Sequence, residues 1–129
     1  IGVAGADYST INAPGSNVNV SASMASPFTI QLVSVNPGTG LVGLANFDPT
    51  QTYQWTLLSA GTISGFAANA FVYDTTTYFS NPLAGGSFSI AQMGNNLVLD
   101  FTPVPEPSTW ALMATGLFTI GAAVRRRRG

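Results

Sequence analysis

Three observations predict an all-β ectodomain followed by a single C-terminal transmembrane α-helix. Residues 1–101 contain short apolar and aromatic runs separated by turn-forming residues, with no sustained helical period. Prolines occupy every second position from 103 to 107, and an uncharged apolar segment then runs up to four consecutive arginines. We therefore divide the chain into a β-rich extracytoplasmic region at 1–102, a proline-rich linker at 103–109, a membrane span at 110–124 and a cytoplasmic basic tail at 125–129.

Five segments cover the first half of the β-rich region. Residues 12–17 read as a loop, and apolar and polar residues then alternate over 18–21, as on a half-buried strand. The next strand is expected over residues 28–35. Residues 36–40 predict a turn, because their proline fixes φ and their glycines accept positive φ. Another short strand is expected over residues 41–47.

The second half is expected to hold two further strands and a hairpin. Residues 53–59 alternate with their aromatic side chains on one face, and residues 66–71 suit a short helical turn. Residues 71–73 read as strand and 74–77 as a turn or sheet edge.

The hairpin is expected over residues 88–101, with its reversal at 92–96, where glycine and asparagine tolerate left-handed conformations. Leu97, Leu99 and Phe101 are expected on its apolar face, with Val98 and Asp100 facing away. A β-solenoid terminus and a β-sandwich both fit this pattern.

The charges are divided unevenly along the 129 residues. All four basic residues lie at 125–128, and residues 1–124 contain no lysine, arginine or histidine. Because binding to phosphates needs basic side chains spread over a surface, we expect no nucleic-acid partner. Cysteine is absent, which excludes disulfides, thiolate metal sites and thiol catalysis but leaves export open.

The C-terminal segment has the physical properties of a membrane anchor. The three prolines cannot continue a central strand, so the β region is expected to end by Thr102. Residues 108–124 give roughly 25 Å of helix against about 30 Å of hydrocarbon core. An interfacial tryptophan and snorkelling arginines close this gap. The residues assigned to the span are Trp110, Ala111, Leu112, Met113, Leu117, Phe118, Ile120 and Val124. By the positive-inside rule the stop-transfer residues Arg125, Arg126, Arg127 and Arg128 stay cytoplasmic.

The order of Val104-Pro105-Glu106-Pro107, an apolar helix from Trp110 and terminal arginines resembles the PEP-CTERM sorting signal of exported proteins of Gram-negative bacteria. The resemblance covers Val104 to Gly129. It implies an exosortase-type processing enzyme and inner-membrane lipid as partners. It also implies export across the inner membrane, initial anchoring by the helix, and a final location at the cell surface or in an extracellular matrix with exopolysaccharide and biofilm.

Residues 86–103 also resemble, over a shorter stretch, the end of exported proteins that carry autotransporter-associated β-strand repeats. This resemblance implies a β-solenoid terminus. The chain starts at Ile1 without a basic or long apolar leader, so either a signal peptide has been removed or the chain is the C-terminal part of a longer protein. We favour the second and expect the chain to be truncated at its start.

No catalytic, metal or cofactor site is expected, and the protein is predicted not to be an enzyme. A serine nucleophile would lack a histidine or lysine base. Asp7, Asp48, Asp74 and Asp100 could supply a carboxylate pair of the glycosidase kind, but aspartates in turns commonly bind their own backbone. No acidic cluster matches a calcium loop.

The aromatic residues of the β region have two interpretations. They form part of the core, or they form a sugar-stacking surface. The residues concerned are Tyr53, Trp55, Tyr73, Tyr78 and Phe79. The second interpretation suits the alternative to a sorted matrix protein, namely a permanently anchored adhesin or carbohydrate-binding module.

Overall fold

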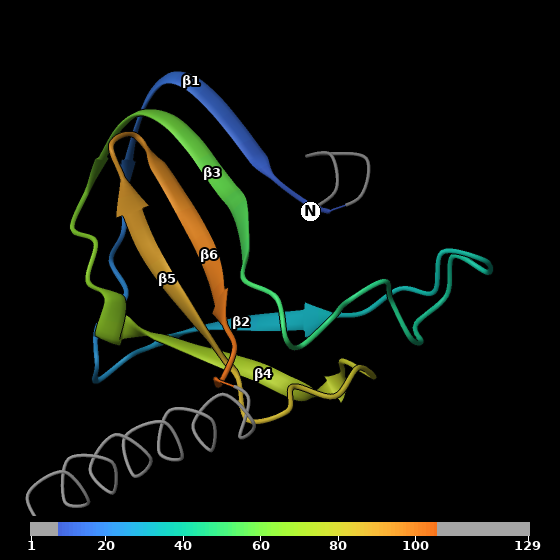
Figure 1. Cartoon of the computed structure of the whole chain (residues 1–129). Coiled ribbons are helices and arrows are strands. Elements are labelled where there is room, and N and C mark those ends of the chain that lie inside the picture. The colour runs from blue at the N-terminus through green and yellow to red at the C-terminus, as the bar shows by residue number, and fades with distance from the viewer. Residues whose placement is uncertain (1–7, 106–129) are drawn as a thin grey trace, which may run out of the picture.

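A computed structural model describes residues 8–105 as six strands and one short 3₁₀ helix (Figure 1). The elements are β1 (Ile11–Asn19), β2 (Phe28–Val33), β3 (Tyr53–Ser64), η1 (Ala68–Ala70), β4 (Phe71–Tyr78), β5 (Ser87–Met93) and β6 (Asn96–Thr102). This content confirms the all-β prediction. Among residues 8–105, no helix has the length and hydropathy needed to cross a membrane. The predicted span at 110–124 lies outside the described residues.

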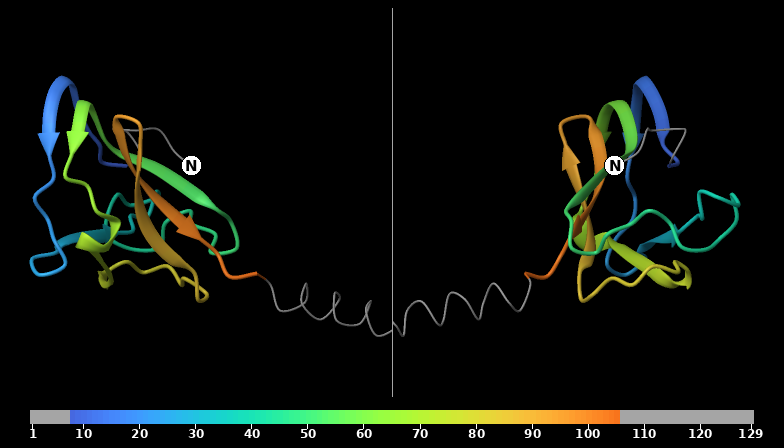
Figure 2. Two further views of the ribbon diagram at one scale, coloured as in Figure 1. Left: turned by 90° about the vertical axis from the view of Figure 1, so that its left-hand side faces the viewer. Right: turned by 45° about the vertical axis from the view of Figure 1, so that its right-hand side comes forward.

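The strands form two sheets whose pairing repeats along the chain. The larger sheet has the order β1-β3-β6-β5, and the smaller sheet consists of β2 and β4. β1 pairs in parallel with β3, and β2 pairs in parallel with β4. We call β1 and β2 with their connection the first coil, and β3 and β4 with theirs the second coil. The first coil is stacked on the second, and Figure 2 shows β1 beside β3 in both views.

The predicted hairpin is confirmed, with a tighter turn than expected. β5 and β6 pair antiparallel from Ser87 and Thr102 up to Met93 and Asn96, so Gly94 and Asn95 alone make the turn. Gly94 has φ of 60°, which suits a two-residue reversal. The sequence predicts that Val98 faces away from Leu97, Leu99 and Phe101, and Val98 belongs to neither of the two buried clusters that those residues join. It is nevertheless only 3% exposed, on the central strand β6 between Thr56 of β3 and Ala91 of β5.

The hydrophobic core belongs to the second coil, η1 and the hairpin. The buried hydrophobic residues are Leu58, Ala70, Phe88, Ile90, Leu97, Val98, Leu99 and Phe101. The first coil contributes only partly buried side chains to this core, such as Ile30 and Leu32 of β2. The ring of Phe101 is fully buried and lies 4.8 Å from the ring centroid of Phe47 and 5.0 Å from that of Phe88. The two sheets therefore share one core that the later strands dominate.

Residues 12–17 do not form the loop that the sequence predicts. They lie within β1, and the turn-forming Pro14-Gly15 pair is absorbed as an irregularity in the pairing between Ala13 and Asn17. Gly15 has φ of 75°. Its backbone lies so close to β3 that a Cβ on Gly61 would come within 2.8 Å of the carbonyl carbon of Gly15. The parallel ladder with β3 overrides the local turn chemistry.

The strand expected over residues 41–47 is also absent. Residues 34–44, which we call the tongue, project from the sheets and contain a single bridge, between Val35 and Val42 (Figure 1). The tongue folds back on itself there, with the N–H of Asn36 donating to the carbonyl of Leu41 and the N–H of Gly43 donating to the carbonyl of Ser34. Residues 41–47 therefore join neither sheet, and one bridge is too little pairing to extend into a strand.

Two buried polar side chains fix the base of the tongue. The Ser34 hydroxyl donates to the carbonyl of Gly43 at 2.6 Å and accepts from the N–H of Ser80 at 2.8 Å. The Asn81 side chain accepts from the N–H of Ala45 and donates to its carbonyl. Both residues were missed in the sequence, because their partners become visible only when the loops meet.

The remaining strand predictions hold with adjusted limits. β2 and β3 occupy the strands expected over 28–35 and 53–59, with β3 extended to Ser64. η1 confirms the helical turn within 66–71. Residues 74–77 lie inside β4, where the register with β2 shifts.

The core packing predicts a large difference between two phenylalanine substitutions. Phe101→Ala should lower the free energy of unfolding by about 3–5 kcal/mol, because it opens a cavity in a fully buried site. Phe28→Ala removes the same atoms from a side chain that is 59% exposed and should cost far less. Thermal unfolding of the purified chain compares the two variants. Equal losses of Tm would contradict a core centred on Phe101.

Candidate functional site

The linker begins where β6 ends, directly after the buried Phe101 and its neighbour Thr102. Thr102 makes the last ladder pair, with Ser87 of β5, and residues 103–105 continue outside any strand. Val104 is 53% exposed. Alternate prolines hold such a segment extended and leave few backbone donors to pair, so its start is open to a binding enzyme.

The turn before β5 lies directly against this exit. Gly85 has φ of 82°, and a Cβ there would lie 3.3 Å from Cγ2 of Val104. A Cβ on Gly86 would collide with the Phe101 ring. Gly86 leaves no room for a side chain and Gly85 needs its positive φ, so this turn packs closely against the end of β6 and against Val104.

The structure places two of the predicted sorting residues. Val104 and Pro105 form the exposed end of the described chain. The other predicted sorting, span and stop-transfer residues lie outside the described residues: Glu106, Pro107, Trp110, Ala111, Leu112, Met113, Leu117, Phe118, Ile120, Val124 and Arg125–Arg128.

The described aspartates are each held by hydrogen bonds from neighbouring threonine or glutamine side chains. One carboxylate oxygen of Asp48 accepts from the N–H of Thr50 at 2.9 Å and from its hydroxyl at 2.7 Å. These bonds lower the pKa of Asp48. Asp100 accepts from the side-chain amide of Gln54 at 2.8 Å across the β3–β6 pair. Asp7 lies outside the described residues.

Asp74 has the largest set of donors. Its carboxylate accepts from the Thr77 hydroxyl at 2.6 Å, from the Gln31 side chain at 3.2 Å and from the N–H groups of Thr76 and Thr77. The Thr77 hydroxyl and then Gln31 lower the pKa of Asp74 most. Asp74 thus organises the irregular part of β4 and ties it to β2. Within residues 8–105 no three acidic, histidine or cysteine side chains are grouped as metal ligands would be.

Most of the aromatic candidates pack into the core instead of forming one surface. Tyr53 and Trp55 stack with ring centroids 5.3 Å apart and planes 9° from parallel. They join Tyr73 and Phe79 around the buried cluster of Phe88, Leu99 and Phe101. Burial raises the pKa of Tyr73. Tyr78 is the exception, since it is exposed at the end of β4.

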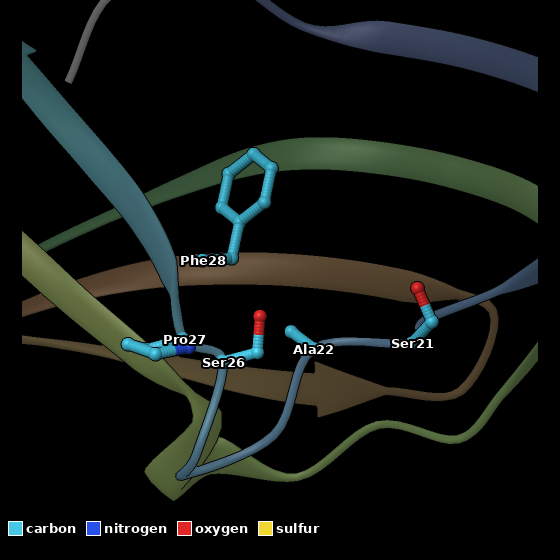
Figure 3. A pocket seen from close by; sticks show the side chains of 5 residues that line it. All are labelled: Ser21, Ala22, Ser26, Pro27 and Phe28. Atoms are coloured by element: carbon cyan, nitrogen blue, oxygen red, sulfur yellow. The ribbon is translucent and has the colours of Figure 1, made fainter.

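One shallow hollow lies beside the start of β2 (Figure 3). Its volume is about 210 Å³, and its lining consists of Ser21, Ala22, Ser26, Pro27 and Phe28. None of these side chains is charged, so the hollow offers hydroxyls and one ring face to a ligand.

Comparison with protein families identifies the C-terminal segment. The model of the PEP-CTERM protein-sorting motif matches residues 103–128. The chain therefore carries a PEP-CTERM sorting motif, a signal that exosortase recognises in exported proteins. Searches of curated proteins and of solved structures return no significant match.

The bonds to Asp74 predict an acid-sensitive contribution to stability. Because its folded pKa is depressed, this contribution is present above the ordinary carboxyl pKa of about 4 and is lost as pH falls through the folded value. Asp74→Asn should therefore flatten the fall of Tm below about pH 4.

Thr77→Val is the matched variant, since it keeps the carboxylate and removes its strongest donor. It should raise the pKa of Asp74 in an NMR titration. An unchanged pKa would show that the Thr77 bond is absent in solution.

Proposed function

We propose that the chain is a non-enzymatic protein of the cell surface or extracellular matrix, with the β region as cargo and the C-terminal motif as its processing signal. The observation that carries this proposal is the sorting motif at residues 103–128. The motif begins one residue after β6 ends, so the folded cargo and the signal do not overlap.

The geometry at the exit supports processing on a folded substrate. An enzyme that holds an extended segment needs backbone that no ladder occupies, and within the described chain residues 103–105 provide it. Phe101 lies just before that point and is fully buried. The strand that leads into the linker is therefore anchored in the core. Cleavage after Pro105 would leave every strand of the cargo intact.

The tail supplies the proposed orientation and partners. The apolar segment 110–124 would lie in the inner membrane, and the arginines would remain cytoplasmic. Exosortase and inner-membrane lipid are then the first partners, and the cargo faces the opposite side. Exopolysaccharide is the proposed later neighbour, in a biofilm matrix.

We also propose that the β region is the end of a β-solenoid. The parallel stacking of β1 on β3 and of β2 on β4 supports this proposal, because successive coils of a solenoid pair in this way. The antiparallel hairpin β5–β6 then acts as the cap on the second coil. A plain sandwich explains the two sheets but not the repeated parallel order.

The absence of enzyme activity is part of the proposal. Each described aspartate already accepts hydrogen bonds from a threonine or a glutamine. This arrangement supports a structural role for these carboxylates.

The sorting signal is tested by changing its acidic and basic residues separately. Glu106→Ala, and replacement of Arg125–Arg128 by glutamine, should each leave the C-terminus unprocessed or the protein mis-sorted. Intact-mass measurement of the cell-associated and released protein provides the readout. Asp48→Ala is the control, because it removes an acidic side chain from an exposed loop of the cargo.

The outcomes separate two classes of protein. A shortened C-terminus in the parent and the control, with a full-length one in both variants, supports sorting. An intact Arg128-Gly129 end in the mature parent protein would contradict it and would favour the permanently anchored adhesin or carbohydrate-binding module.

A further inference from the structure

The turn before β5 is attached to the core at both of its ends. We call residues 83–86 the exit turn, and the N–H of Gly86 donates to the carbonyl of Leu83 across it at 2.8 Å. The Leu83 side chain packs against the buried cluster that contains Phe101. At the other end, a Cβ on Gly86 would collide with the Phe101 ring, so the backbone cannot move closer to β6. The core therefore determines the position of the exit turn.

The two residues at the tip of the exit turn have an unusual backbone conformation. Ala84 has φ of 50° and Gly85 has φ of 82°. Within residues 8–105, Ala84 is the one residue other than glycine with a positive φ. An L-residue avoids this region because its Cβ crowds the neighbouring carbonyl. Such conformations persist where the surrounding structure imposes them, and they cluster at functional sites.

The tip of the exit turn faces the first residues of the sorting motif. A Cβ on Gly85 would lie 3.3 Å from Cγ2 of Val104, which is the second residue of the matched segment 103–128. Val104 is 53% exposed in this position. Because Gly85 has no side chain, the exit turn contacts Val104 through its backbone and leaves much of the valine side chain accessible.

The surface around this contact is neutral. Residues 75–99 and 101–105 contain no charged residue. Pro82, Ala84 and Val104 are all exposed. An enzyme that encloses residues 103–105 comes within contact distance of the exit turn, since Gly85 lies directly against Val104. It can cover this surface without burying an unpaired charge.

We propose that the exit turn is a docking contact for exosortase on the folded cargo, and that Gly85 is a positioning residue that keeps Val104 accessible to the enzyme. The inference rests on the proposed function, because it takes the processing enzyme as the partner. It adds that the enzyme contacts part of the β region as well as the linear motif. A side chain at position 85 would press on Val104, since the core holds the exit turn in place.

The positioning role is tested by adding a side chain beside Val104. Gly85→Asn does this with a residue that accepts a positive φ. In cells that contain exosortase, the full chain should be processed roughly tenfold more slowly or less, because small displacements of a bound segment cost large factors in rate. Intact-mass measurement after a pulse of synthesis gives the rate at which the C-terminus is shortened.

Gly94→Asn is the matched control for this variant. Gly94 also has a positive φ, of 60°, and it lies at the opposite end of the β5–β6 hairpin. No atom lies within 4 Å of the position of its Cβ, so the same substitution meets open space there. This control should be processed at the rate of the parent chain.

A charge variant tests the docking contact without adding a group beside Val104. Ala84→Asp places a charge in the neutral surface that the enzyme would cover, and processing should slow. Aspartate accepts a positive φ better than alanine, so this variant should fold at least as stably as the parent. Asn95→Asp adds the same charge to the exposed turn at the far end of the hairpin and should leave the rate unchanged. Thermal unfolding of all four variants verifies that each one folds.

A double variant separates positioning from a general effect on the fold. Val104→Ala removes the Cγ2 atom that a side chain at position 85 would press on. Gly85→Asn should therefore slow processing by a smaller factor in the Val104→Ala chain than in the parent. A purely structural role of Gly85 predicts the same factor in both chains.

Three results would overturn the inference. Processing at the parent rate in the folded Gly85→Asn and Ala84→Asp variants would show that exosortase does not contact the exit turn, and the sorting function would stand. Equal slowing in these variants and in their controls would indicate a general effect on the hairpin. An intact C-terminus in the parent chain would contradict the proposed function itself, and this inference with it.

Discussion

Phe101 lies at the end of β6 with no exposed surface, and segments far apart in the sequence converge on its ring. Phe47 reaches it from the connection before β3, and Phe88 reaches it from β5. The backbone of Gly86 leaves no room for anything larger than hydrogen beside it. This packing joins the second coil, the hairpin and the turn at the exit, and it determines where the linker begins.

Side chains are more deeply buried in the second coil and the hairpin than in the first coil. The buried hydrophobic residues all follow residue 57, whereas the first coil depends on its ladders with β3 and β4 and on half-buried side chains. Strands held mainly by backbone pairing open more readily than strands in a core. The first coil therefore depends on the second, and the most stable structure lies nearest to the tail.

The sequence predicted those parts of the fold whose signals are local. The hairpin and β3 were found because their apolar residues alternate in the sequence and turn residues separate β5 from β6, although burial itself alternates clearly only along β5. The sorting motif was found because its chemistry lies in consecutive residues. The errors have long-range causes. The loop at 12–17 became strand because β3 pairs with its backbone, and the strand at 41–47 failed because its residues meet only the short segment 34–36 and join neither sheet. Asn81 gains its role through contacts 36 residues away, and Ser34 gains its role partly through a contact 46 residues away. The parallel order of the coils has no local signal at all.

The near absence of charge constrains how this chain protects its sheets. Lysine and glutamate are the usual gatekeepers on exposed strands, and residues 8–105 contain neither, nor any arginine. The chain uses instead a proline in β1, and an aspartate with an irregular segment in β4. Each device is specific to one edge, since none acts at a distance as net charge would.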